Sequence, residues 1–165
     1  MAKKKTKRCT SVSARKTYPA VANPEVKAIV IDCIDPRFPI AFRRFVEEEL
    51  GLHEGEFVRI EIAGGPAALA HPKDMFNRCR LMLRQMNFSY DHFGTIVRII
   101  LIAHQDCGYY SVVPKNGNNQ DREKNDLQEA MFLVSLTSPE RTRIEGYYAF
   151  FANKSQTRIA FEKVV

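Results

Sequence analysis

The stretch 95-TIVRIILIAHQDCG-108 decides how this chain folds, because an apolar, β-branched run ends abruptly in polar residues. Residues 95–103 have the pattern of a strand that is buried on both faces, as in a parallel sheet. The run continues directly into His104, and Cys107 follows three positions later. An imidazole and a thiolate at this spacing can turn toward one metal ion, but two ligands rarely make a protein metal site. Any further ligand has to come from elsewhere in the chain.

Two other apolar runs have the same character. Residues 26–32 (VKAIVID) end at Cys33, and residues 56–63 (EFVRIEIA) are closed by the glycine pair Gly64 and Gly65. Helical patterns separate the three runs. Strands that alternate with helices imply right-handed crossovers and a parallel sheet.

Three segments predict the helices. The first helix starts near Pro39, in the position where proline is tolerated best. The second covers residues 74–86, with Asp74 placed to cap its start. The third covers residues 126–136 and follows a polar loop over residues 114–126.

The end of the chain differs from the rest. Residues 146–164 alternate apolar and polar side chains around NKSQ, which predicts an antiparallel hairpin at a sheet edge. The fold class is therefore α/β, with a mostly parallel central sheet flanked by helices and a C-terminal antiparallel hairpin. A chain of 165 residues can form one core. We expect a basic, flexible arm over residues 1–22 and a single domain over residues 23–165.

The net charge of +6 comes from one end of the chain. Seven of the 25 basic residues and none of the 19 acidic residues lie in residues 1–17, so the remainder is close to neutral. This tail either contacts nucleic acid or membrane phosphates or is a solvated arm. It lacks the apolar core of a secretory signal, and no stretch approaches the ~20 apolar residues of a membrane span. These features predict a soluble, cytoplasmic protein with no membrane span.

The four cysteines lie far apart and do not indicate a disulfide framework. They are Cys9, Cys33, Cys79 and Cys107. Cys79 falls on the apolar stripe of the second predicted helix, which favours a role in the core over one as a ligand. Metal ligation, catalysis or burial remain open for the others.

A metal site follows from where the strands end. In open α/β sheets, ligands bind outside the carboxyl ends of the strands. If the strands that precede Cys33 and His104 are neighbours, these two residues converge with Cys107. Two thiolates and one imidazole suit Zn²⁺. Three protein ligands leave a fourth position for water, whose pKa zinc lowers to about 7.

Asp35 and Arg37 follow Cys33 at alternating positions and can form a bidentate ion pair. An ionised Asp35 would accept a hydrogen bond from a zinc-bound hydroxide and orient it. Arg37 would keep Asp35 ionised and off the metal. The alternative is an Asp-Pro-Arg turn that carries a surface ion pair.

Several other residues have two possible roles each. Gly64 and Gly65 can offer backbone N–H groups to an anion or simply form a turn. Asp106 can orient a ligand or act as the acid at a helix N-terminus. His71 is either a candidate proton shuttle or simply a polar loop residue. Aromatic and apolar candidates for the pocket wall or the core are Phe38, Ile62, Tyr109 and Tyr110.

Taken together, these motifs resemble the β-class carbonic anhydrases. The resemblance rests on C-x-D-x-R at residues 33–37, A-G-G at 63–65, H-x-x-C-G at 104–108 and the terminal hairpin. It covers most of residues 26–163. It implies a zinc enzyme that interconverts CO₂ and bicarbonate through a zinc-bound hydroxide. It also implies a homodimer or larger homo-oligomer whose active site lies near the subunit interface.

The resemblance assigns a role to each motif. Cys33, His104 and Cys107 are implied as zinc ligands, and Asp35 with Arg37 as the catalytic dyad beside the metal. In some members of that family the aspartate moves onto zinc and closes the site, and this state is open to Asp35 as well.

The chain also departs from the family pattern. Glu61 and Ile62 stand where the family usually has Arg-Asn, Pro66 is not expected, and no substrate-binding glutamine is evident upstream of Cys33. A divergent member is therefore expected. The alternatives are a zinc hydrolase that acts on carbonyl sulfide or carbon disulfide, and a catalytically silent zinc-binding homologue that binds partners through its basic tail.

Overall fold

A computed structural model describes residues 17–111 and 119–164. Residues 1–16, 112–118 and 165 lie outside this description, and with them most of the expected basic arm and Cys9. No helix within the described ranges is long and apolar enough to cross a membrane.

The described residues form a five-stranded sheet in the order β2-β1-β3-β4-β5. The first four strands run parallel, and β5 runs antiparallel to β4. This arrangement confirms the predicted fold class and the terminal hairpin. The strands are β1 (Ala28–Cys33), β2 (Phe57–Ile62), β3 (Arg98–His104), β4 (Arg143–Phe151) and β5 (Ile159–Val164).

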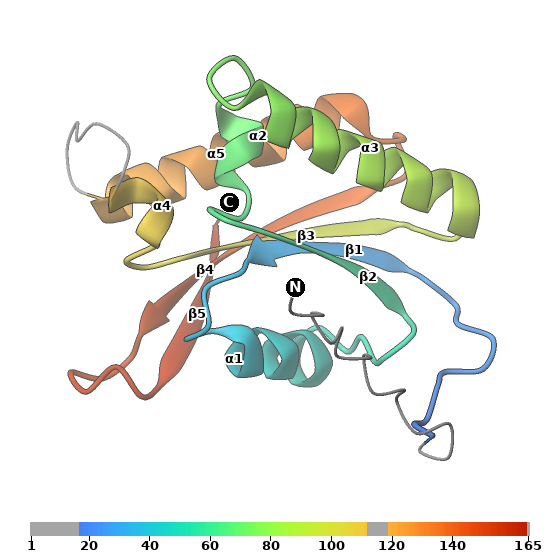
Figure 1. Cartoon of the computed structure of the whole chain (residues 1–165), viewed down its shortest axis with the longest axis horizontal. Coiled ribbons are helices and arrows are strands. Elements are labelled where there is room, and N and C mark those ends of the chain that lie inside the picture. The colour runs from blue at the N-terminus through green and yellow to red at the C-terminus, as the bar shows by residue number, and fades with distance from the viewer. Residues whose placement is uncertain (1–16, 112–118, 165) are drawn as a thin grey trace, which may run out of the picture.

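Helices cover both faces of the sheet (Figure 1). The helix α1 and the π-helical turn η1 lie on one face, and α2, α3 and α5 lie on the other. Their bounds are α1 (Pro39–Arg44), η1 (Phe45–Glu49), α2 (Ala67–Ala70), α3 (Phe76–Phe93), α4 (Gly108–Ser111) and α5 (Asn119–Thr137).

Two predictions about helix ends were wrong. The cap position of α3 is one residue later than expected: Met75 occupies it without a side-chain hydrogen bond, so Asp74 does not cap the helix. The helix α5 already includes Asn119, whereas the sequence placed residues 114–126 in a loop. Four consecutive or near-consecutive polar residues of this segment are good helix formers, and Glu123 and Asp126 are buried while Gln120, Asp121 and Asn125 are exposed. The good helix formers are Gln120, Arg122, Glu123 and Lys124. The polar composition of this segment was therefore a poor guide, because the segment forms the amphipathic first turns of α5.

Alternation along the strands divides the core into two layers. Ile29 and Ile31 of β1 pack with the α3 and α5 side, and Ala28 and Val30 pack with the α1 side. All four are at most 1% exposed. Burying an isoleucine contributes about 1.5–3 kcal/mol, so both layers stabilise the position of β1. Cys79 is buried in the first layer, which agrees with its predicted place in the core.

The position of β1 brings two strand ends together. It pairs with β2 on one side and with β3 on the other, with Ile31 opposite Leu101. Cys33 and His104, the last residues of β1 and β3, therefore lie side by side at the carboxyl ends of these strands. The condition that the sequence set for a metal site is met.

Candidate metal centre

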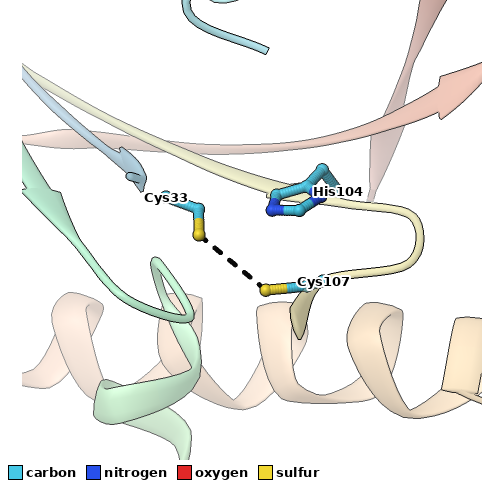
Figure 2. Close-up of side chains that lie close together, drawn as sticks. All are labelled: Cys33, His104 and Cys107. Atoms are coloured by element: carbon cyan, nitrogen blue, oxygen red, sulfur yellow. Dashed lines mark hydrogen bonds between the residues drawn. The ribbon is translucent and has the colours of Figure 1, made fainter. Parts of the chain in front are cut away.

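Cys33, His104 and Cys107 form one buried cluster. One ligand atom from each residue can be chosen so that all three lie within 4.8 Å of one another. The two sulfur atoms are 3.8 Å apart, and both thiols are free. Figure 2 shows the sulfurs facing each other with the imidazole beside them. A set of two thiols and one imidazole is suited to zinc.

A sharp turn lets residues from one segment reach the cluster from two sides. The His104 ring packs on Phe38, with ring centroids 4.2 Å apart, on the α1 side of the sheet. Asp106 then adopts a left-handed backbone with φ 54°. Aspartate tolerates this conformation better than most residues. The turn brings Cys107 back toward Cys33 at the start of α4.

The hydrogen bonds of His104 leave one nitrogen available. Its Nδ1 lies 2.9 Å from the carbonyl oxygen of Gln105, to which it donates. Its Nε2 is buried and forms no hydrogen bond of good geometry with the described residues. The nearby Cys33 sulfur interacts with the imidazole only through a weaker contact, which favours the protonated ring. A buried, unpaired polar atom costs about 1–3 kcal/mol. A metal ion held by Nε2 and the two sulfurs would remove this cost.

The two thiols are close enough for one to donate a hydrogen bond to the other. The hydrogen bond from the Cys107 thiol lowers the pKa of Cys33 to about 4 against the opposing effect of burial, and His104 and the Gly64 N–H add to the shift. The same hydrogen bond and burial raise the pKa of Cys107. Metal ligands must be deprotonated, so a bound cation would replace the thiol proton and draw both sulfurs to it.

Asp35 and Arg37 form the predicted bidentate pair. Arg37 Nε donates to Asp35 Oδ1 at 3.0 Å, and Nη2 donates to Oδ2 at 2.8 Å. The backbone N–H of Arg37 also donates to Oδ1. These bonds from Arg37 lower the pKa of Asp35, so the carboxylate is ionised at neutral pH.

This pair is more than a surface contact. Arg37 Nη2 also donates to the carbonyl oxygen of Asp106 at 2.8 Å, inside the H-x-x-C turn. The guanidinium lies over the rings of Phe38 and Phe151, at 5.4 and 5.5 Å from their centroids. The structure thus joins the C-x-D-x-R and H-x-x-C motifs. The catalytic role of the pair remains a prediction.

Positions 64 and 65 require glycine for two reasons: the space for a side chain is missing and the backbone φ is positive. Both are buried and have positive φ angles of 86° and 53°. A Cβ on Gly64 would lie 2.8 Å from the Tyr109 ring, and one on Gly65 would lie 3.2 Å from the backbone of Asp32 and Cys33. The Gly64 N–H is directed at the Cys33 sulfur. The role of this pair in binding an anion remains a prediction.

The other candidates lie around the cluster or away from it. His71 Nε2 is 2.9 Å from Asp126 Oδ2, which also accepts the Tyr110 hydroxyl, so the structure ties His71 to α5 rather than to the cluster. Tyr110 is buried, as expected for the core. Tyr109 packs on Gly64 and points its hydroxyl at the Met75 sulfur. Ile62 is the β-sheet partner of Cys33.

Sequence reasoning missed Glu123 of α5. This residue is 1% exposed, and its carboxylate accepts the backbone N–H of Cys107 at 3.1 Å. The signal was present, because Glu123 continues the buried stripe of Leu127, Ala130 and Val134 at helical spacing. Assigning the segment to a loop concealed it.

Comparisons with known proteins support the fold. No family model matches this chain, and no curated protein matches it. Solved structures do. A carbonic anhydrase from Streptococcus mutans is 18% identical with a TM-score of 0.58, over 91% of this chain and 88% of that one. A β-carbonic anhydrase from Trichomonas vaginalis is 14% identical with a TM-score of 0.57, over 91% and 88%. A carbonic anhydrase from Glaciozyma antarctica is 21% identical with a TM-score of 0.53, over 86% and 83%. The predicted resemblance is confirmed for the fold, which is that of the β-carbonic anhydrases.

The ligand assignment predicts what happens when Cys107 is replaced. Cys107→Ser should lower zinc affinity at least about 100-fold, because a hydroxyl is a much poorer ligand than a thiolate. Competition with a chromophoric chelator measures this. Cys79→Ser is the matched control, since it also alters a buried thiol but lies in the core and should retain zinc. Full zinc binding by Cys107→Ser would exclude Cys107 as a ligand.

The glycine geometry predicts unequal costs for two alanine substitutions. Gly94 has φ 65° but open space around it, so Gly94→Ala should lower the free energy of unfolding by about 1–2 kcal/mol from backbone strain alone. Gly65→Ala adds a clash with the backbone at Cys33 and should cost about 1–3 kcal/mol more. Urea denaturation compares the two. Equal losses of unfolding free energy in the two variants would mean that the backbone at the end of β1 can shift to accommodate the added methyl group.

Proposed function

We propose that this protein is a zinc-dependent lyase, a carbonic anhydrase that catalyses the reversible hydration of CO₂ to bicarbonate. One observation carries the proposal: Cys33, His104 and Cys107 converge in a buried cluster in which His104 Nε2 has no good hydrogen bond from the described residues. The β-carbonic anhydrase fold and the adjoining Asp35–Arg37 pair support it.

The residues present fit a zinc ion. We propose Cys33 Sγ, Cys107 Sγ and His104 Nε2 as its ligands, since Nδ1 is already bound to the Gln105 carbonyl. Zinc, when bound, supplies a Lewis acid that makes water nucleophilic at neutral pH. Three protein ligands leave room for one further group beside Asp35.

Asp35 is proposed to orient the attacking water. Its carboxylate can only accept hydrogen bonds when ionised, and Arg37 keeps it ionised through hydrogen bonds from three N–H donors. Held in this way, Asp35 fixes the direction in which a water lone pair points toward the carbon of CO₂. Arg37 also resists a movement of Asp35 toward the thiols.

The surroundings suit a small apolar substrate. Phe38, which is fully buried, gives the site an apolar wall against His104. Water attack on CO₂ yields bicarbonate and one proton. Since the Arg37 side chain is 40% exposed, the Asp35–Arg37 pair lies close enough to solvent for that proton to leave. Gly64 and Gly65 are proposed to line the bicarbonate side.

A second electrophile is favoured by one specific feature. Ile62 is partly buried beside Cys33, where the family usually has a polar residue, and the Glu61 carboxylate is paired with Arg59 at 3.1 Å. An apolar side chain at this position suits carbonyl sulfide or carbon disulfide. Turnover of these compounds relative to CO₂ distinguishes the hydrolase from the lyase. Zinc binding without turnover of any of them would indicate the silent homologue.

Self-association and a cytoplasmic location belong to the same proposal. The strand β2 forms an outer edge of the sheet, and the neighbouring helix α3 exposes large apolar side chains. They are Phe76, Leu81 and Phe88. Such surfaces are typical of contacts between proteins. Light scattering should give a mass of at least twice the chain's 18.9 kDa, and a mass equal to one chain would exclude self-association.

Zinc analysis combined with a CO₂ hydration assay tests the proposed function directly. We expect one zinc per chain and CO₂ hydration between about pH 6 and 9, the range in which an activated water titrates. Stopped-flow measurement with a pH indicator reports the rate. Stoichiometric zinc without any hydration would refute the activity and leave the metal site in place.

Asp35→Ala separates catalysis from metal binding. The variant should keep its zinc but lose about 10²–10⁴-fold in turnover, because the water is no longer oriented. Glu47→Ala is the control: Glu47 is another carboxylate paired with an arginine, Arg43, on the exposed side of η1. It should leave turnover unchanged. Near-normal turnover by Asp35→Ala would remove Asp35 from the mechanism.

A further inference from the structure

One peptide group next to the cluster is bound at both of its polar ends. The carbonyl oxygen of Asp106 accepts a hydrogen bond from Arg37 Nη2 at 2.8 Å. The N–H of Cys107 donates to Glu123 Oε1 at 3.1 Å. These two groups belong to the single planar peptide that joins Asp106 to Cys107. The Arg37 guanidinium thus holds the peptide oxygen and a carboxyl oxygen of Glu123 holds the peptide N–H, so both ends of the peptide dipole are paired.

This peptide controls where the Cys107 side chain points. Asp106 has φ 54°, a left-handed conformation that costs a non-glycine residue about 1–2 kcal/mol. A peptide beside such a residue can rotate to relieve the strain, and rotation would redirect Cys107. Bonds to both ends of the peptide oppose that rotation.

Glu123 is an unusual residue for this place. It is 1% exposed, and carboxylates are rarely so buried without a paired cation. Within residues 17–111 and 119–164 it forms no salt bridge, and its second oxygen accepts the Tyr148 hydroxyl at 2.6 Å. Burying such a group costs free energy that a neutral side chain would not require. The hydrogen bond from the Cys107 N–H offers a reason for a carboxyl group to be buried here.

We propose that Glu123 is a positioning residue for Cys107. Together with Arg37 it fixes the peptide that precedes Cys107, and so it holds the Sγ atom toward Cys33 and His104. This inference rests on the proposed function, because it takes Cys107 as a zinc ligand. It adds that the metal site depends on α5, and that the Asp35–Arg37 pair and α5 act on one peptide from opposite sides.

Zinc affinity of the full chain tests this role with three variants. Glu123→Ala removes the acceptor of the Cys107 N–H and should lower zinc affinity about 10–100-fold, the usual cost of losing a residue that supports a ligand. Glu123→Gln keeps an oxygen acceptor and should bind zinc within about threefold of the wild type. Asp126→Ala is the control, because it removes another buried carboxylate one turn along α5 that does not bind a ligand's N–H. It should lower stability in urea but leave zinc affinity within about threefold.

Replacing zinc with cobalt provides a second measurement, an absorption spectrum, which a loss of stability alone would not change. The thiolate-to-cobalt absorption band should weaken in cobalt-loaded Glu123→Ala and persist in Glu123→Gln and Asp126→Ala. If Glu123→Ala fails to fold, Glu123→Asp replaces it. The aspartate keeps the carboxyl group but is one methylene shorter, and the loss of zinc affinity should reach about tenfold.

Two results would overturn the inference: unchanged zinc affinity in Glu123→Ala, or an equal loss in Asp126→Ala. Either would leave the proposed activity standing. Conversely, wild-type protein that binds zinc but does not hydrate CO₂ would refute the activity, while the affinity comparison would still decide the role of Glu123.

Discussion

The parallel pairing of β1 with β3 is the interaction on which the site depends. It places Ile31 opposite Leu101, so the two strands end side by side although 70 positions separate Cys33 from His104. Both strands are buried on both faces, and a slip by one residue would turn each side chain to the opposite layer. The two core layers therefore fix the register of the strands, and the register brings Cys33 and His104 together.

Hydrogen bonding beyond the strand ends then fixes each side chain. The Gln105 carbonyl orients His104, the Gly64 N–H is directed at Cys33, and Glu123 holds the Cys107 backbone. Arg37 links this shell to Asp35. Buried polar groups of this kind cost free energy when unpaired, so a nearly complete network defines a single arrangement. Among the three side chains of the cluster, His104 Nε2 is buried without a hydrogen-bond partner from the described residues, at the place where a cation would complete the network.

Much of this could be predicted because it follows from local patterns. The strand positions follow from apolar runs, the cluster from the strand ends, and the Asp35–Arg37 pair from residues two positions apart. The contacts of Glu123, Asp126 and His71 could not be predicted in the same way, because they depend on how α5 and α2 pack over the sheet. The left-handed turn at Asp106 was hidden for a related reason: aspartate permits this conformation but does not require it. The ion pair beside the cluster was thus foreseen, whereas the residue that supports Cys107 was not.

X-ray absorption at the zinc edge of the purified protein tests the central claim most directly, namely that these three residues hold a zinc ion with one position left open. The account predicts two sulfur atoms at about 2.3 Å and two lighter atoms at about 2.0–2.1 Å, one from His104 and one from a non-protein group. The imidazole contribution to the absorption spectrum should correspond to a single histidine. A zinc ion bound only by nitrogen and oxygen, or by fewer than two sulfurs, would contradict the account.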